Sequence, residues 1–139
     1  MAQTGKLMRL HLACLCERAV LRGNTVDLNS IAAQIITNRL PCVLGAADYK
    51  PKTVLVWVDV ERAFVPLAVL HDPRGGRHEF TLPRVPGDGD TAVQSLALDG
   101  VRLEHAGLHR IEFSVDGQTK GELTFKVLTA SVAPEALYA

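Results

Sequence analysis

The stretch that decides the fold is Leu108–Val127, which reads LHRIEFSVDGQTKGELTFKV. Apolar and polar residues alternate over residues 111–115 and again over residues 123–127, as in a strand with one buried and one solvated face. Asp116-Gly117 between these two runs is a strong turn signal. The stretch therefore predicts a β-hairpin, with a loop of several residues over 116–121 that is longer than a tight turn.

The same period of two recurs along the rest of the chain. Residues 53–60 are apolar on both faces, which predicts a central strand, and further strand patterns cover residues 63–71, 77–82 and 93–98. Turn signals separate these runs at intervals of about ten residues. We therefore expect an all-β fold, an antiparallel β-sandwich of about 7–9 strands with immunoglobulin-like or related topology. We expect one domain over 1–139, with an ordered core of about 6–128 and a tail over 129–139.

The N-terminal third of the chain is more ambiguous. Residues 7–21 predict an extended, largely buried segment that ends in a turn at Gly23-Asn24. Residues 25–40 fit two structures. A helix would place three isoleucines on one side after a cap at Asn29 or Ser30, whereas the β-branched content and the preceding turn favour a strand. We favour the strand.

Composition limits the classes of function. The chain has 139 residues, with 15 Lys+Arg and 15 Asp+Glu, and its formal net charge is +0. We therefore expect no nucleic-acid partner, because binding phosphates usually requires excess basic charge. No apolar run reaches the roughly 18 residues of a membrane span, so we expect no membrane partner. The 3 cysteines are an odd number, which favours a reducing, cytoplasmic location with Cys14 and Cys16 in the core.

No common catalytic motif occurs in the sequence. It lacks a nucleophile elbow, a Walker A loop, a dinucleotide-binding glycine motif and the HExxH zinc motif. We therefore predict no catalytic residue and no cofactor. The best candidates for metal ligands are His71, Asp72 and His78, because a hairpin turn between them could bring the two imidazoles together. Arg74 and Arg77 in the same turn would disfavour a cation.

Three other residues are of types that often occur in functional sites. His105 and His109 are four residues apart, but Gly107 between them makes a helix unfavourable, so we expect both on the surface or at a strand edge. Trp57 is the only tryptophan, and its place in the predicted central strand favours the core.

The order of features resembles a family of small bacterial β-sandwich proteins of unknown function. The stretches that carry the resemblance are residues 20–24 (VLRGN), Leu40-Pro41, residues 107–117 and residues 123–127. The likeness extends over roughly residues 6–128. The early turn departs from the family pattern, since Arg-Gly-Asn stands where an Asp-Gly-Lys type is expected. The resemblance implies a β-sandwich and brings no site residues.

These observations favour a non-enzymatic binding module. Exposed strand edges are natural surfaces for a protein partner or for a homo-oligomer formed by sheet extension. The alternative is a metal-binding protein or metal-dependent enzyme that uses His71, Asp72 and His78. A module for small ligands is less favoured, because aromatic residues make up only 5% of the chain.

Overall fold

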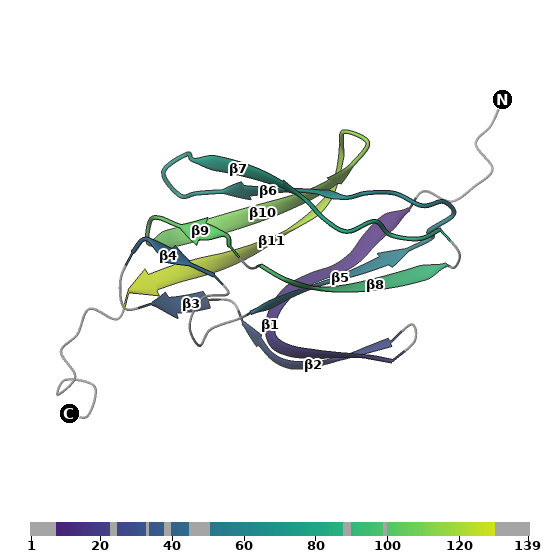
Figure 1. The fold of residues 1–139 in the computed structure, drawn as a ribbon, viewed down its shortest axis with the longest axis horizontal. Coiled ribbons are helices and arrows are strands. Elements are labelled where there is room, and N and C mark those ends of the chain that lie inside the picture. The colour runs from purple at the N-terminus through teal and green to yellow at the C-terminus, as the bar shows by residue number, and fades with distance from the viewer. Residues whose placement is uncertain are drawn as a thin grey trace.

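The computed structural model describes residues 8–22, 25–32, 34–37, 40–44, 51–87, 90–98 and 100–129. These residues form strands and no helix, which confirms the all-β prediction (Figure 1). Residues 1–7 and 130–139 lie outside the described residues, as do Gly23 and Asn24 of the predicted turn. The strands are β1 (Arg9–Arg22), β2 (Thr25–Ala32), β3 (Gln34–Thr37), β4 (Cys42–Val43), β5 (Lys52–Val58), β6 (Leu67–His71), β7 (Arg77–Thr81), β8 (Thr91–Ala97), β9 (Arg102–Leu103), β10 (Gly107–Val115) and β11 (Gln118–Thr129).

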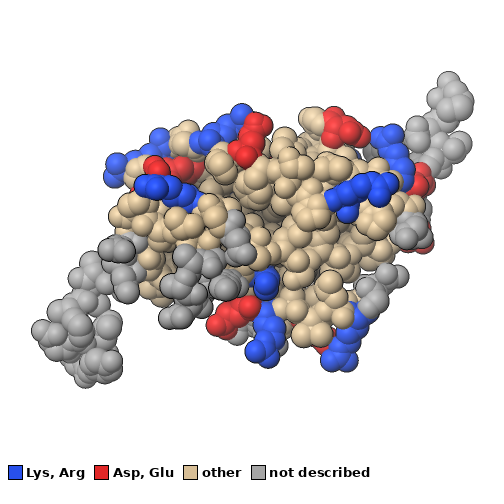
Figure 2. Space-filling model, viewed as in Figure 1, with Lys and Arg blue, Asp and Glu red and all other residues tan. Residues whose placement is uncertain are grey.

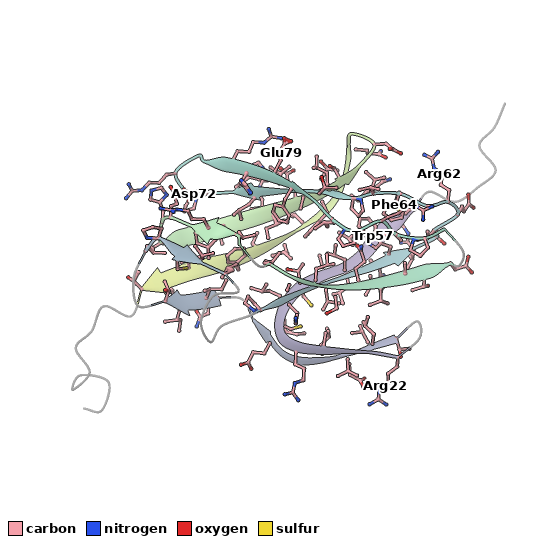
Figure 3. All side chains as sticks on the ribbon, viewed as in Figure 1. Arg22, Trp57, Arg62, Phe64, Asp72 and Glu79 are labelled. Carbon is pink, nitrogen blue, oxygen red and sulfur yellow. The ribbon has the colours of Figure 1, made fainter. Side chains whose placement is uncertain are left out.

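Two large sheets form the sandwich. One is four-stranded with the order β2-β1-β5-β8, and the other is five-stranded with the order β3-β11-β10-β6-β7 (Figure 1). Their inner faces meet in one apolar core, in which Trp57 is 0% exposed, as predicted. The Trp57 ring meets the Phe64 ring edge-to-face, with the ring centroids 5.0 Å apart, and Figure 3 shows the two side by side. The core therefore joins the central strand β5 to the segment before β6.

The predicted hairpin is the pair β10–β11, in which Ile111 lies opposite Leu123. Its turn is tighter than predicted. Asp116 and Gly117 both have positive φ (51° and 79°), as a two-residue hairpin turn requires, and β11 begins directly after them. The additional residue is accommodated within the strand, where the register shifts between Phe113 and Ser114. A bulge therefore replaces the longer loop that the sequence predicted.

The prediction of strand for residues 25–40 is confirmed, but the segment forms two strands in two sheets. β2 pairs antiparallel with β1 at the edge of the four-stranded sheet. β3 pairs parallel with β11 at the edge of the five-stranded sheet. One short stretch of chain thus supplies an outer strand to both sheets, on the same side of the sandwich (Figure 1).

β9 pairs with β4, so that Leu103 lies opposite Cys42 in a separate two-stranded sheet. The strand predicted over residues 63–71 begins only after Pro66, and this strand, β6, is an inner strand of its sheet. The Pro66 carbonyl accepts a hydrogen bond from the Leu82 backbone N–H at 3.0 Å. Proline is accommodated here because no ladder N–H is needed at its position.

Candidate functional site

The predicted metal ligands lie around the β6–β7 hairpin, but the strand register separates them. His71 lies opposite Arg77, and His78 lies opposite Leu70. Because side chains alternate between faces along a strand, His71 and His78 point to opposite faces of the sheet. His71 contacts Glu112 on the outer face, and His78 does not share that face. In the part of the chain that the structure describes, no three His, Cys, Asp or Glu side chains are arranged to hold a metal ion.

The structure instead places Asp72 at the centre of a different cluster. Its carboxylate accepts hydrogen bonds from the backbone N–H of Arg74 at 2.7 Å and from His105 Nδ1 at 2.8 Å. A second imidazole, that of His109, places Nε2 3.6 Å from Asp72 Oδ2, which is too long for a hydrogen bond. Asp72 thus connects the β6–β7 turn to the residues that lead into β10, at one end of the molecule (Figure 3).

Asp72 is held in its ionised form by these neighbours. Burial raises the pKa of Asp72, but the hydrogen bonds from Arg74 and His105 and the charges of His105 and His109 outweigh burial, so the pKa lies below its usual value. The cluster therefore contains a stable carboxylate at neutral pH. The hydrogen bonds of this cluster hold the β6–β7 turn against the residues before β10, which is a structural role.

His109 is buried, which corrects the prediction of a surface position. Its side chain is 1% exposed and stacks on Phe125, with the ring centroids 5.3 Å apart. Nδ1 donates a hydrogen bond to the Gly107 carbonyl at 3.1 Å, whereas Nε2 has no hydrogen-bond partner. The sequence contained the signal for this position, since His109 lies two residues before Ile111 and the strand alternation puts both on the buried face.

The three cysteines form no disulfide with one another. Cys14, Cys16 and Cys42 are all free. Burial raises the pKa of the Cys14 thiol, and the neighbouring Cys16 raises it further. Burial also raises the pKa of Cys16, although a hydrogen bond to the Arg18 carbonyl opposes this effect. Both raised pKa values favour the neutral thiol over the more reactive thiolate at physiological pH.

The most exposed large apolar side chain in the described part of the chain lies on the edge strand β2. Ile31 is 65% exposed, and Val20 and Leu21 on the adjoining strand β1 are 42% and 47% exposed. In the register of the hairpin, Ile31 lies opposite Cys16 and Val20 lies opposite Asp27. Ile31 and Val20 therefore share one face of the hairpin, with the exposed Arg18 between them, and Ile31 lies on a free strand edge.

Charged groups are spread over the surface in pairs of opposite sign. Arg22 contacts Asp27 at 2.9 Å and Arg62 contacts Asp116 at 3.2 Å. Figure 2 shows Lys and Arg side chains near Asp or Glu around the rim of the visible face, with uncharged residues across its middle. On this face, positive and negative side chains lie near one another, and no large patch of a single charge forms.

Comparison with known proteins gives similarity of fold alone. No protein-family model matches the chain, and no curated protein sequence matches it. Among solved structures, it is similar to the alkylpurine DNA glycosylase AlkC of Pseudomonas fluorescens bound to DNA containing an abasic site analog, with 13% identity and a TM-score of 0.53. The similarity covers 87% of this chain and 30% of the glycosylase chain. An immunoglobulin-like protein from Pseudomonas aeruginosa has 16% identity and a TM-score of 0.44, with coverage of 90% and 99%.

The expectation that nucleic acid is not a partner has to be corrected. A fold similar to this one occurs in a glycosylase bound to DNA. The physical reason is that the net charge is a sum over the whole chain, whereas a contact with DNA needs only a local surface. Among the described residues there is also no helix that is long and apolar enough to cross a membrane.

Proposed function

We propose that this chain is a non-enzymatic β-sandwich module that assembles with a second copy of itself along the free edge of β2. In the described part of the chain, β2 pairs with a strand on one side only. It has 8 residues, and the N–H and C=O groups on its outer side form a template for another strand. The exposed Ile31 on this strand is the observation that carries the proposal.

The chemistry of the segment supports pairing. Natural edge strands are usually protected by charged side chains, proline or bulges. Residues 28–37 contain no charged residue, no proline and no glycine, and they are rich in isoleucine. By contrast, β7 at the far edge of the other sheet carries Arg77 and Glu79, which are exposed. β8, the other edge of the same sheet, also carries no charge, but none of its large apolar side chains is exposed as Ile31 is.

The charge distribution does not oppose self-association. The chain has a formal net charge of +0, so two copies do not repel each other at long range. Asp27 is the one charged residue in the sequence of β2, and Arg22 of the same hairpin neutralises it at 2.9 Å. An antiparallel arrangement about a two-fold axis would join the two four-stranded sheets into one continuous sheet.

Sedimentation velocity over a range of protein concentrations tests this proposal. We expect the wild-type protein to form dimers and Ile31→Lys to be a monomer, because a lysine on the edge strand places two positive charges at the two-fold contact. Val65→Lys is the matched control, since Val65 is 49% exposed but lies outside the strands. A wild-type protein that stays monomeric, or an Ile31→Lys protein that still forms dimers, would contradict the proposal.

A second candidate function is contact with DNA as part of a longer protein. The similarity to a DNA-bound glycosylase, of which this chain matches 30%, supports it. Arg74 and Arg77 are exposed at the β6–β7 turn and could contact phosphates. Fluorescence anisotropy with a labelled duplex that contains an abasic-site analogue is the measurement. We expect binding that weakens in the Arg74→Ala/Arg77→Ala protein, and an unchanged anisotropy with the wild-type protein would remove this candidate.

A further inference from the structure

The side of the sandwich away from β2 and β3 contains a cleft between the two sheets. β7 and β8 are the outer strands on this side, and a cleft of about 480 Å³ lies between them. Phe80 and His78 lie opposite Ala68 and Leu70 in the β6–β7 ladder, which turns both rings toward the inner face. The other main lining residues are Leu82, Leu96, Leu98 and Val101.

The lining determines the kind of molecule that fits. The His78 and Phe80 rings lie together on one wall of the cleft, with centroids 6.0 Å apart and planes tilted by 30°. Aliphatic side chains and polar groups, among them Thr81 and Ser95, share the rest of the lining about equally, and no Lys, Arg, Asp or Glu is among the described residues that line the cleft. A charged ligand would lose its hydration there without gaining an ion pair, which is costly. The volume lies within the range of about 300–1,000 Å³ that is typical of small-molecule sites.

One glutamine fixes the spacing of the cleft. Trp57 Nε1 donates a hydrogen bond to Gln94 Oε1 at 3.0 Å, and Gln94 Nε2 donates one to the Pro83 carbonyl at 2.9 Å. Gln94 belongs to β8, whereas Pro83 follows β7 and lines the cleft. Gln94 therefore joins the two edges directly, and the buried Trp57 holds the Gln94 side chain in place. A site formed before the ligand arrives loses less free energy to ordering on binding.

We infer that this cleft binds a small, uncharged molecule that carries both an aromatic ring and polar atoms. The low content of Phe, Trp and Tyr in the chain disfavoured such a function at the level of sequence. The fold nevertheless places the Phe80 ring beside the imidazole of His78 at an accessible edge, where contact with a ligand ring adds to the apolar contact. The site is independent of the β2 edge, because it lies on the other side of both sheets.

Titration of the intact protein with Prodan, an uncharged naphthalene dye whose emission shifts to the blue in apolar surroundings, tests the inference. We expect a saturable blue shift with the wild-type protein. His78→Ala and Phe80→Ala should each weaken binding about fivefold or more, because each removes one ring of the wall. His78 is exposed, so His78→Ala keeps the test valid even if Phe80→Ala impairs folding, which a thermal melt would show.

The matched control is Glu79→Ala. Glu79 lies between the two ring-bearing residues in sequence, but it is opposite Val69 and points away from the cleft (Figure 3). We expect this protein to bind Prodan like the wild type. The inference is overturned if the wild-type protein gives no blue shift, or if Glu79→Ala weakens binding as much as His78→Ala. Loss of binding in Ile31→Lys would also overturn it, because the dye would then lie on the β1–β2 hairpin.

Discussion

Replacing Asp72 with alanine should destabilise the protein by about 2 kcal/mol. The substitution keeps the backbone hydrogen bonds of the turn, from Asp72 N to the Gly76 carbonyl and from Gly75 N to the Asp72 carbonyl. It removes the acceptor for Arg74 N–H and for His105 Nδ1. Hydrogen bonds to a charged group contribute about 1.5–3 kcal/mol each when buried. Because the His105 and Asp72 side chains are 33% and 15% exposed, we take the lower part of that range and allow for water as a substitute partner.

The pH dependence gives a second, independent measurement. The folded-state pKa of Asp72 is lowered, so its contribution is fully present above the unfolded value of about 3.9 and is lost as pH falls through the folded-state pKa. The free energy of unfolding should therefore decrease more steeply below about pH 4 in the wild type than in Asp72→Ala. Urea denaturation followed by the fluorescence of Trp57, which is 0% exposed, measures both effects.

Glu79→Ala serves as the comparison for this prediction. Glu79 is a carboxylate on the same hairpin, but its contact with Arg77 is 3.8 Å long and both side chains are largely exposed. We expect it to change the free energy of unfolding by less than about 0.5 kcal/mol. The reasoning is refuted if Asp72→Ala is as stable as Glu79→Ala, or if both lose stability equally steeply in acid.

Three other predictions concern the core, a thiol and the backbone. Gln94→Leu should lower the free energy of unfolding in urea denaturation by about 1–3 kcal/mol, because the buried Trp57 N–H loses its acceptor. An unchanged urea midpoint would contradict this. In a variant that keeps Cys16 as its only cysteine, Ellman's reagent should react slowly until urea unfolds the protein, since burial raises the pKa of this thiol; rapid reaction of the folded protein would be inconsistent. Gly107→Ala should lower the melting temperature more than Gly117→Ala, because an added Cβ at Gly107 would lie 3.3 Å from a proline, whereas Gly117 has open space; the reverse order would refute the strain argument.

The sequence was most informative where structure is local. The hairpin predicted over residues 108–127 forms β10 and β11, because alternation and a turn dipeptide act between residues close in sequence. The pairing of β4 with β9 and the parallel pairing of β3 with β11 were not predicted. These pairs join segments far apart in the chain, and their choice depends on how the two sheets close on a shared core. Local patterns contain no information about that closure.

The candidate sites were harder to predict than the fold. The trio His71, Asp72 and His78 was chosen because its members are close in sequence, but the register of the hairpin put the two histidines on opposite faces. The actual neighbours of Asp72 are His105 and His109, more than thirty positions away in the chain. Burial of His109 could have been derived from the alternation of side chains along the strand, which puts His109 on the same face as Ile111. Its position beside Asp72 required the arrangement of β6 next to β10.

The parallel pair of β3 and β11 has a mechanical consequence. In this pair Gln34 lies opposite Lys126 and Thr37 lies opposite Thr129. A tension that acts on the chain before β3 and on the chain after β11 pulls the two strands past each other, so their hydrogen bonds are loaded together. The β1–β2 hairpin would instead open one residue pair at a time. Under such a load the short parallel ladder resists as a unit, because its hydrogen bonds must break together.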